Sequence, residues 1–202
     1  MELISDIREL IPSELIKVSE IIEGKFSYSE FSFKSRIKRI FESIISLLIL
    51  IISSPLILIA ALLIKLEDGG PVFYSQIRNG FEGKEFKIIK LRTMIINAEK
   101  DGEQWADKFD SRITFTGNIL RKLRIDELPQ LIQVITGKMS LIGPRPERPK
   151  IDIYLRKNIP NYDLRYSIKP GISGWAQVNY PYGASLEDSR LKLSYDIYYI
   201  KN

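Results

Sequence analysis

The chain has 202 residues, of which 45% are hydrophobic, and its formal net charge is +5. This length suits one domain with a modest core and a small appendage. Cysteine and histidine are both absent, which excludes disulfides, Cys/His zinc sites and every Ser-His or Cys-His catalytic relay. Catalysis would therefore need carboxylates, hydroxyls, Lys, Arg or Tyr, and a metal would need oxygen ligands, which makes Mg²⁺ the ordinary candidate beside phosphate.

The charge is distributed unevenly along the chain. Residues 1–33 hold seven acids and three bases, which leaves 27 bases and 18 acids, a surplus of nine (27 minus 18), in the remainder. Such a surplus suits phosphorylated substrates, anionic lipid surfaces or nucleic acid. We interpret residues 1–33 as a helical lead-in or a linker, so the chemistry should lie in the residues that follow.

A long apolar segment covers residues 43–64 without a single charged side chain. A straight helix of this length spans about 33 Å, which matches the roughly 30 Å core of a bilayer. Lys and Arg residues flank both of its ends, and such flanks prefer the cytoplasmic side of a membrane. Ser54 and Pro55 lie at its centre, where proline removes a helix hydrogen bond. We therefore predict that residues 34–66 form a basic flank and a re-entrant membrane helix that bends at Ser54 and Pro55.

A β-hairpin is predicted after the apolar segment. Residues 72–77 and 86–91 have the composition of two strands around a polar loop at 78–84. On the second strand Lys90 and Arg92 share one face, so the two cations could project together. An exposed polar edge explains the same pattern equally well at this level.

Two helices are predicted next, at residues 118–124 and 127–136, the second closed by Gly137. Asp126 falls at the N-cap of the second helix and Glu127 in its first turn, where capping alone would explain both acids. Further along, Pro144 and Pro146 bracket Arg145 and restrict the backbone on both sides. An arginine that is held in this way is suited to bidentate recognition of phosphate.

Six blocks carry a family resemblance when they are taken in order. They are the basic-flanked apolar segment with Ser54-Pro55, then PVFYSQIRNG, FKIIKLRTM, RIDELPQL, MSLIGPRP and KPGISGWAQVNYPYGAS. Over residues 34–202 the chain resembles the bacterial sugar transferases, which are monotopic polyprenyl-phosphate phosphoglycosyl transferases. With the predicted elements, this gives an expected α+β fold: a small, mostly helical catalytic domain with a β-hairpin and a re-entrant membrane helix.

The resemblance also implies a domain organisation. Residues 67–202 would form the cytosolic phosphoglycosyl transferase domain, behind the lead-in at 1–33 and the membrane segment at 34–66. The family usually continues beyond a Tyr-x-x-N sequence like that at residues 199–202, so we expect a chain that is shortened at its C-terminal end. The VNYPYGAS block resembles larger members that carry an additional N-terminal membrane domain.

The activity implied by the resemblance is transfer of a sugar 1-phosphate from a UDP-sugar to polyprenyl (undecaprenyl) phosphate at the inner face of the bacterial inner membrane. UMP would be released, and the step would initiate exopolysaccharide, capsule or O-antigen assembly. Asp126 would be the nucleophile that forms an aspartyl phosphosugar, and Asp126 and Glu127 would hold Mg²⁺. Lys90, Arg92 and Arg145 would bind substrate phosphate. Further candidates are Gln76, Arg78, Lys169, Gln177 and Asp196.

Two other functions remain open on the sequence. The first is a non-catalytic, membrane-tethered basic module that binds anionic lipid or nucleic acid, although no nucleic-acid-binding motif is recognisable and we expect no such partner. The second is an ordinary glycosyl transferase, which would release UDP in place of UMP. The expected partners are a UDP-sugar, a polyprenyl phosphate and an anionic bilayer, and homo-oligomer formation stays open.

Overall fold

The fold is α+β and mostly helical, as the sequence predicts. It is described by a computed structural model over residues 33–100, 110–181, 183 and 185–201, so the predicted lead-in lies outside the described residues apart from Phe33. The elements in chain order are α3 (Phe33–Asp68), β1 (Phe73–Asn79), η2 (Phe81–Gly83), β2 (Glu85–Leu91), α4 (Phe115–Lys122), η3 (Ile125–Gln130), α5 (Leu131–Ile135), β3 (Ser140–Ile142), α6 (Pro149–Asn158), η4 (Tyr162–Ser167), β4 (Gly171–Ser173), α7 (Trp175–Asn179) and α8 (Leu186–Lys201).

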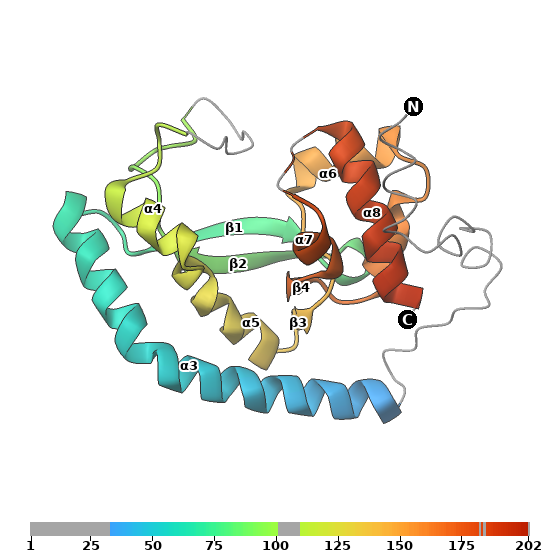
Figure 1. The fold of residues 1–202 in the computed structure, drawn as a ribbon, viewed down its shortest axis with the longest axis horizontal. Coiled ribbons are helices and arrows are strands. Elements are labelled where there is room, and N and C mark those ends of the chain that lie inside the picture. The colour runs from blue at the N-terminus through green and yellow to red at the C-terminus, as the bar shows by residue number, and fades with distance from the viewer. Residues whose placement is uncertain (1–32, 101–109, 182, 184, 202) are drawn as a thin grey trace.

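Helix α3 is a single helix of 36 residues that runs through Pro55. The Ser54 hydroxyl donates to the carbonyl of Ile51 at 2.8 Å, which is the carbonyl that Pro55, lacking an N–H, leaves unbonded. The predicted break is therefore a bend within a continuous helix, and Figure 1 shows α3 bowed along its length. It is the one helix in the described part of the chain that is long and apolar enough to cross a membrane.

The β-hairpin is confirmed. Strands β1 and β2 pair antiparallel, from Phe73 opposite Leu91 to Asn79 opposite Glu85. The first strand runs through Arg78 and Asn79, which the sequence analysis placed in the loop. The connecting turn is tighter than predicted because Gly83 adopts a left-handed φ of 71°, and the Gly80 N–H donates to the Lys84 carbonyl at 2.9 Å.

The two predicted helices are shifted. Helix α4 begins at Phe115 because Thr114 caps it, accepting a hydrogen bond from the Gly117 N–H at 3.0 Å. The segment predicted as a helix from 127 to 136 is the 3-10 turn η3 followed by the short α5. The Glu127 N–H bonds the Arg124 carbonyl, three residues back, at 3.4 Å, which is the 3-10 pattern. Asp126 therefore lies inside a turn whose cap is Arg124, and its predicted N-cap position is wrong.

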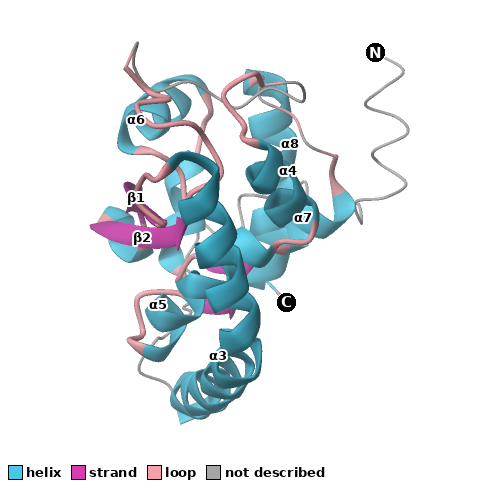
Figure 2. Cartoon of the chain, turned by 90° about the vertical axis from the view of Figure 1, so that its left-hand side faces the viewer, coloured by secondary structure: helices cyan, strands magenta, loops and turns pink. Residues whose placement is uncertain are grey.

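The elements are layered between α3 and the C-terminal helices. Figure 1 shows α3 curving around the outside of α4 and α5, with the hairpin beyond them and α6, α7 and α8 gathered near the far ends of the strands. In the side view of Figure 2, α5 and the hairpin lie to the left and α7 and α8 to the right. One hydrophobic cluster joins these layers, since Ala60 and Ile64 of α3 pack with Leu91, Leu120 and Ile125. The apolar helix is thus part of the core that supports the hairpin.

Arg92 fastens the end of α3 to the end of β2. Its guanidinium donates to both carboxylate oxygens of Asp68 and, through Nε, to the Pro71 carbonyl at 2.6 Å. The hydrogen bonds from Arg92 lower the pKa of Asp68 to about 2. These contacts give Arg92 a structural role.

Replacing Arg92 by Met should destabilise the protein by about 2 kcal/mol, because charge-assisted hydrogen bonds to Asp68 and a backbone carbonyl are lost together. Thermal unfolding in detergent micelles measures the change. Lys87→Met, which removes an exposed cation from the same strand, should leave the unfolding midpoint within about a degree or two. Equal stability of both variants would favour the phosphate-binding role that the sequence suggests for Arg92.

Candidate active site

The site centres on Asp126 and Glu127, two consecutive acids in the first turn of η3. Both side chains are buried, with 5% and 8% exposure. Glu127 is engaged, because its Oε1 accepts from Arg145 Nη2 at 2.5 Å and its Oε2 lies 3.6 Å from Arg124 Nη1. Asp126 Oδ1 has no hydrogen-bond partner among the described residues. A buried carboxylate oxygen without a partner is rare in folded proteins, and it leaves Asp126 available to a ligand.

The apolar neighbours of these residues fix where they lie. Ile125 precedes Asp126 and Leu91 follows Lys90, and both belong to the cluster that Ala60 and Ile64 of α3 complete. Polar and apolar positions therefore alternate at the two segments that build the site. The packing against the apolar helix directly orients the groups that would do chemistry.

Three cations act on the Asp126 carboxylate. Burial first, and then the charge of Glu127, raise the pKa of Asp126, while Lys90, Arg121 and Arg145 oppose the shift. Burial also acts to raise the pKa of Glu127, but Arg145, Arg124 and Lys90 together outweigh it and the net shift is downward. The pKa of Lys90 is lowered to about 8, chiefly by burial and then by Arg78. Shifts with these causes are typical of functional sites.

Arg121 is a site residue that the sequence analysis missed. It lies in the last turn of α4, where basic residues are common, so no local signal distinguishes it. Its Nε donates to the Thr93 hydroxyl at 2.8 Å, and its charge acts on both Asp126 and Lys90.

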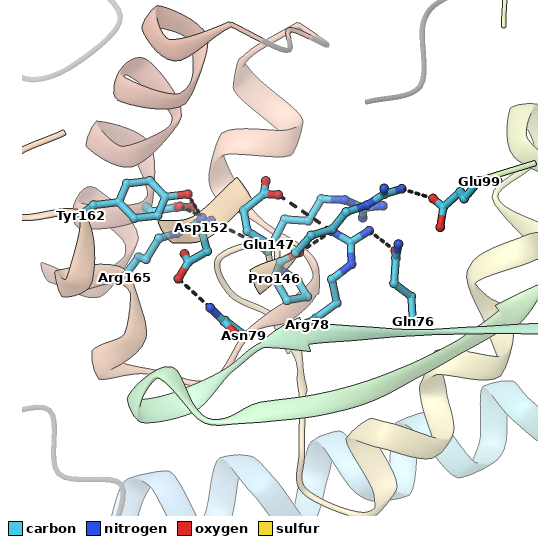
Figure 3. A network of polar contacts seen from close by, with 12 residues as sticks. Gln76, Arg78, Asn79, Glu99, Pro146, Glu147, Asp152, Tyr162 and Arg165 are labelled. Carbon is cyan, nitrogen blue, oxygen red and sulfur yellow. Dashed lines mark hydrogen bonds and ion pairs between the residues drawn. The ribbon is translucent and has the colours of Figure 1, made fainter. Parts of the chain in front are cut away.

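Most of the other predicted residues lie along the Pro-Arg-Pro segment. Gln76 and Arg78 of β1 are hydrogen-bonded to each other at 2.8 Å, and Arg78 also donates to the Pro146 carbonyl at 3.1 Å, as Figure 3 shows. Asp196 lies on α8 and pairs with Arg165 at 2.9 Å. No hydrogen bond or ion pair joins Gln76, Arg78 or Asp196 to Asp126 in the described structure.

Two predicted residues lie apart from this cluster. Lys169 lines a cavity of about 790 Å³ between the start of α3 and the end of α8, and neither Asp126 nor Glu127 lines it. Gln177 lies in α7 and donates to the Ile172 carbonyl of β4 at 3.4 Å. Their roles, and that of Arg92 in binding phosphate, stay predictions.

The acid pair fits a divalent cation. No group of three or more acidic side chains gathers anywhere in the described residues, so a metal would take Asp126 and Glu127 together with substrate phosphate and water. Magnesium is commonly bound in this way, through one or two carboxylates. The oxygen of Asp126 that lacks a partner suits such a hard cation.

The comparison with known families agrees with this arrangement. The model of the family described as "Bacterial sugar transferase" matches residues 33–202, which include every residue discussed above. The chain belongs to this family. The family match extends from the first described residue of α3 to the end of α8, so the apolar helix and the acid pair fall within a single family unit.

Three relatives within this family are between 40% and 47% identical to the chain over the residues that align. A protein of Aeromonas hydrophila named UDP-N-acetylgalactosamine-undecaprenyl-phosphate N-acetylgalactosaminephosphotransferase is 47% identical over 82% of the chain and 39% of the relative. UDP-glucose:undecaprenyl-phosphate glucose-1-phosphate transferases of Caulobacter vibrioides and Escherichia coli are 42% and 40% identical, over 81% and 82% of the chain. The chain spans only 62% and 36% of the length of these two.

Replacing Asp126 by Asn should stabilise the protein at neutral pH. The fold raises the pKa of Asp126. The free energy of unfolding of the wild type therefore falls as the pH rises from the ordinary to the raised pKa. The Asn variant does not titrate, so it avoids this loss. We expect a gain in stability at pH 7 that becomes smaller as the pH falls to 4. Denaturant unfolding at the two pH values measures it.

A matched control is Asp152→Asn. Asp152 is also buried, and burial raises its pKa too, but its carboxylate accepts hydrogen bonds from Asn79 at 2.6 Å, from Arg156 at 2.7 Å and from Tyr166, which the Asn variant would lose. Its replacement should therefore destabilise the protein. A loss of stability in both variants would show that Asp126 is a structural carboxylate too.

Proposed function

We propose that the chain transfers a sugar 1-phosphate from a UDP-sugar to undecaprenyl phosphate, releases UMP and thereby initiates the assembly of a surface polysaccharide. The observation that carries the proposal is the Asp126 carboxylate, which is buried, has an oxygen without a partner and is acted on by three cations. The names of the relatives support the two substrates. Their two different sugars leave the sugar of this chain open.

The reaction would proceed in two displacements at phosphorus. In the first, a carboxylate oxygen of Asp126 attacks the phosphorus that carries the sugar, and the bond to UMP breaks as UMP leaves. In the second, an anionic oxygen of undecaprenyl phosphate attacks the same phosphorus and displaces Asp126, which regenerates the carboxylate. Neither nucleophile needs to lose a proton first, which suits a chain without histidine.

The cations would stabilise the charge that develops on the transferred group. Arg145 offers a fork that binds phosphate oxygens, and Lys90 and Arg121 act on the same carboxylate from β2 and α4. Glu127 orients Arg145 through their 2.5 Å contact. A divalent cation, which we propose to be Mg²⁺ held by Asp126 and Glu127, would neutralise diphosphate charge when bound.

We propose that α3 enters and leaves the membrane on the cytoplasmic side and that residues 67–202 form the catalytic domain there. Both ends of α3 are fastened to this one domain: Glu42 near the start accepts from Ser140 at 2.6 Å, and Asp68 at the end pairs with Arg92. A helix that crossed the bilayer would have to separate these contacts. Its exposed apolar residues, such as Ile52, lie between the two attachments.

The non-catalytic alternative is not favoured by the site. Binding of an anionic lipid surface requires exposed cations, and it gives no reason for two buried acids at the centre of the cationic groups. Each buried charge of that kind lowers the stability of the folded chain unless it is compensated. The arrangement is expected for an enzyme that binds phosphate and a metal at one carboxylate.

Asp126→Asn should abolish UMP release from a UDP-sugar by the chain in lipid nanodiscs, while the protein stays folded. Glu127→Gln should lower the rate by roughly two to three orders of magnitude, because Arg145 loses its orienting partner but the nucleophile remains. UMP is measured with a panel of UDP-sugars, with Glu85→Gln, at an exposed acid in β2, as the control that retains full activity.

The covalent intermediate gives a separate test. Wild-type chain incubated with a UDP-sugar labelled in the sugar, without undecaprenyl phosphate, should carry a phosphosugar on the peptide that contains Asp126. Kinetics that require both substrates to be bound at once, with no adduct at any time, would instead establish direct transfer.

Cysteines placed at positions 36 and 87 should both react with a membrane-impermeant maleimide from the cytoplasmic side. The native chain has no cysteine, so each variant carries a single thiol. A third variant, Ile52→Cys, should be protected from reagent on either side. Reaction of positions 36 and 87 from opposite sides would establish a helix that spans the membrane.

A further inference from the structure

The segment that carries Arg145 is held almost entirely through its carbonyl groups. Pro144 and Pro146 have no N–H, so carbonyl oxygens are the main backbone groups left for anchoring. Four consecutive carbonyls each accept a hydrogen bond, and the donors come from three elements, β4, η4 and β1. The carbonyls are those of Pro144 from Gly171 N at 2.9 Å, Arg145 from Arg165 Nη2 at 2.8 Å, Pro146 from Arg78 Nη1 at 3.1 Å and Glu147 from Asn79 N at 2.9 Å.

The donor to Arg145 itself is a buried charged side chain. Arg165 lies in η4 and is 7% exposed, and Figure 3 shows it reaching from beside Tyr162. The same Nη2 that bonds the Arg145 carbonyl lies 2.9 Å from Asp196 Oδ2, and Nη1 donates to the Tyr162 hydroxyl. Arg165 is thus held by Tyr162 of η4 and Asp196 of α8, in addition to its hydrogen bond to the Arg145 carbonyl.

A buried ion pair of this kind is a weak source of stability, because desolvation cancels most of the attraction. The more important effect of the Arg165–Asp196 pair is to fix the orientation of the Arg165 guanidinium. The guanidinium is rigid and planar, so its bond to Asp196 fixes the direction in which Nη2 points at the Arg145 carbonyl. Arg145 in turn extends a side chain that is 42% exposed toward Glu127. A small shift of its backbone would move the phosphate-binding fork by a similar amount or more.

We propose that Arg165, held by Asp196, is a positioning residue that sets the place of Arg145 in the site. The proposal rests on the proposed function only in taking Arg145 as a ligand of substrate phosphate. In the described structure no hydrogen bond or ion pair joins Arg165 or Asp196 to Asp126 or Glu127, so they act through Arg145. The C-terminal helix α8 is thereby linked to the phosphate-binding site.

The test is a double-mutant cycle on UMP release. Arg165→Lys keeps a charge for Asp196 but loses the forked geometry, and we expect kcat/KM for the UDP-sugar to fall roughly tenfold or more. Arg145→Lys should cause a loss at least as large. If Arg165 acts through Arg145, the double variant loses little more than Arg145→Lys alone. Losses that multiply would overturn the proposal.

Arg112→Lys is the matched control. Arg112 also pairs with a carboxylate, Asp110 at 2.6 Å, and donates to a backbone carbonyl, that of Ala98 at 3.2 Å. It makes no contact with the Pro-Arg-Pro segment in the described structure, so kcat/KM should be unchanged. If Arg165→Lys does not fold, Tyr162→Phe replaces it in the cycle, because it removes one partner of Arg165 and keeps the packed ring.

A second readout is independent of catalysis. The side-chain Nε–H resonance of Arg145, assigned by its disappearance in Arg145→Lys, should shift or broaden in Tyr162→Phe and stay in place in Arg112→Lys. Absence of UMP release from the wild type would overturn the proposed function, and the resonance alone would then decide the positioning. If the Arg145 resonance does not change in Tyr162→Phe, the proposal that Arg165 positions Arg145 is wrong, even if the chain is fully active.

Discussion

The ion pair between Arg145 and Glu127 is the contact on which the rest of the site depends. It joins the Pro-Arg-Pro segment to η3 at 2.5 Å and leaves the neighbouring Asp126 without a hydrogen-bond partner on one oxygen. Were Glu127 unpaired, two adjacent buried carboxylates would compete for the same cations and one would take up a proton. The pair instead keeps Glu127 ionised, and of these two neighbouring acids only Asp126 has a raised pKa.

The proposed function requires a water-soluble nucleotide and a lipid-dissolved phosphate to reach the same carboxylate. The core cluster shows how the fold could meet this constraint. Ala60 and Ile64 of the apolar helix pack on Leu91 and Ile125, the immediate neighbours of Lys90 and Asp126. The depth of α3 in a membrane would therefore set the height of the nucleophile above it. A flexible tether between anchor and site would not fix this distance.

Local patterns were sufficient to predict the hairpin, the long apolar helix and the Gly137 stop. The family blocks identified the acid pair, but local rules misplaced it. Asp followed by Glu and a proline is typical of a helix N-terminus, whereas the chain forms a 3-10 turn that begins one residue earlier, at Ile125, with Arg124 as its cap. A capping Asp126 would use its carboxylate to accept a hydrogen bond from a backbone N–H. In the structure one oxygen of Asp126 has no hydrogen-bond partner, so the wrong N-cap prediction also hid the group that is available to a ligand.

The contacts that sequence reasoning missed are those between distant segments. Arg92 follows Lys90 by two positions, but its partner is Asp68, 24 residues earlier. Arg165 lies 20 residues from Arg145 and 31 from Asp196 (196 minus 165), in a segment with no recognisable motif. No periodicity reports such pairings, because they depend on how whole elements pack. A single sequence therefore gives the residue types of this site more readily than the network that orients them.

The buried acids of the domain separate into two kinds. Asp152 accepts hydrogen bonds from three side chains, and Asp196 pairs with Arg165, so both join elements together. Asp126 is surrounded by positive charge and yet is left incomplete. A carboxylate in that state contributes nothing to stability at neutral pH, since replacing it with a neutral side chain should make the folded chain more stable. Its presence is most simply explained if a ligand completes its environment, and the surrounding cations require that ligand to bring negative charge, as a phosphate does.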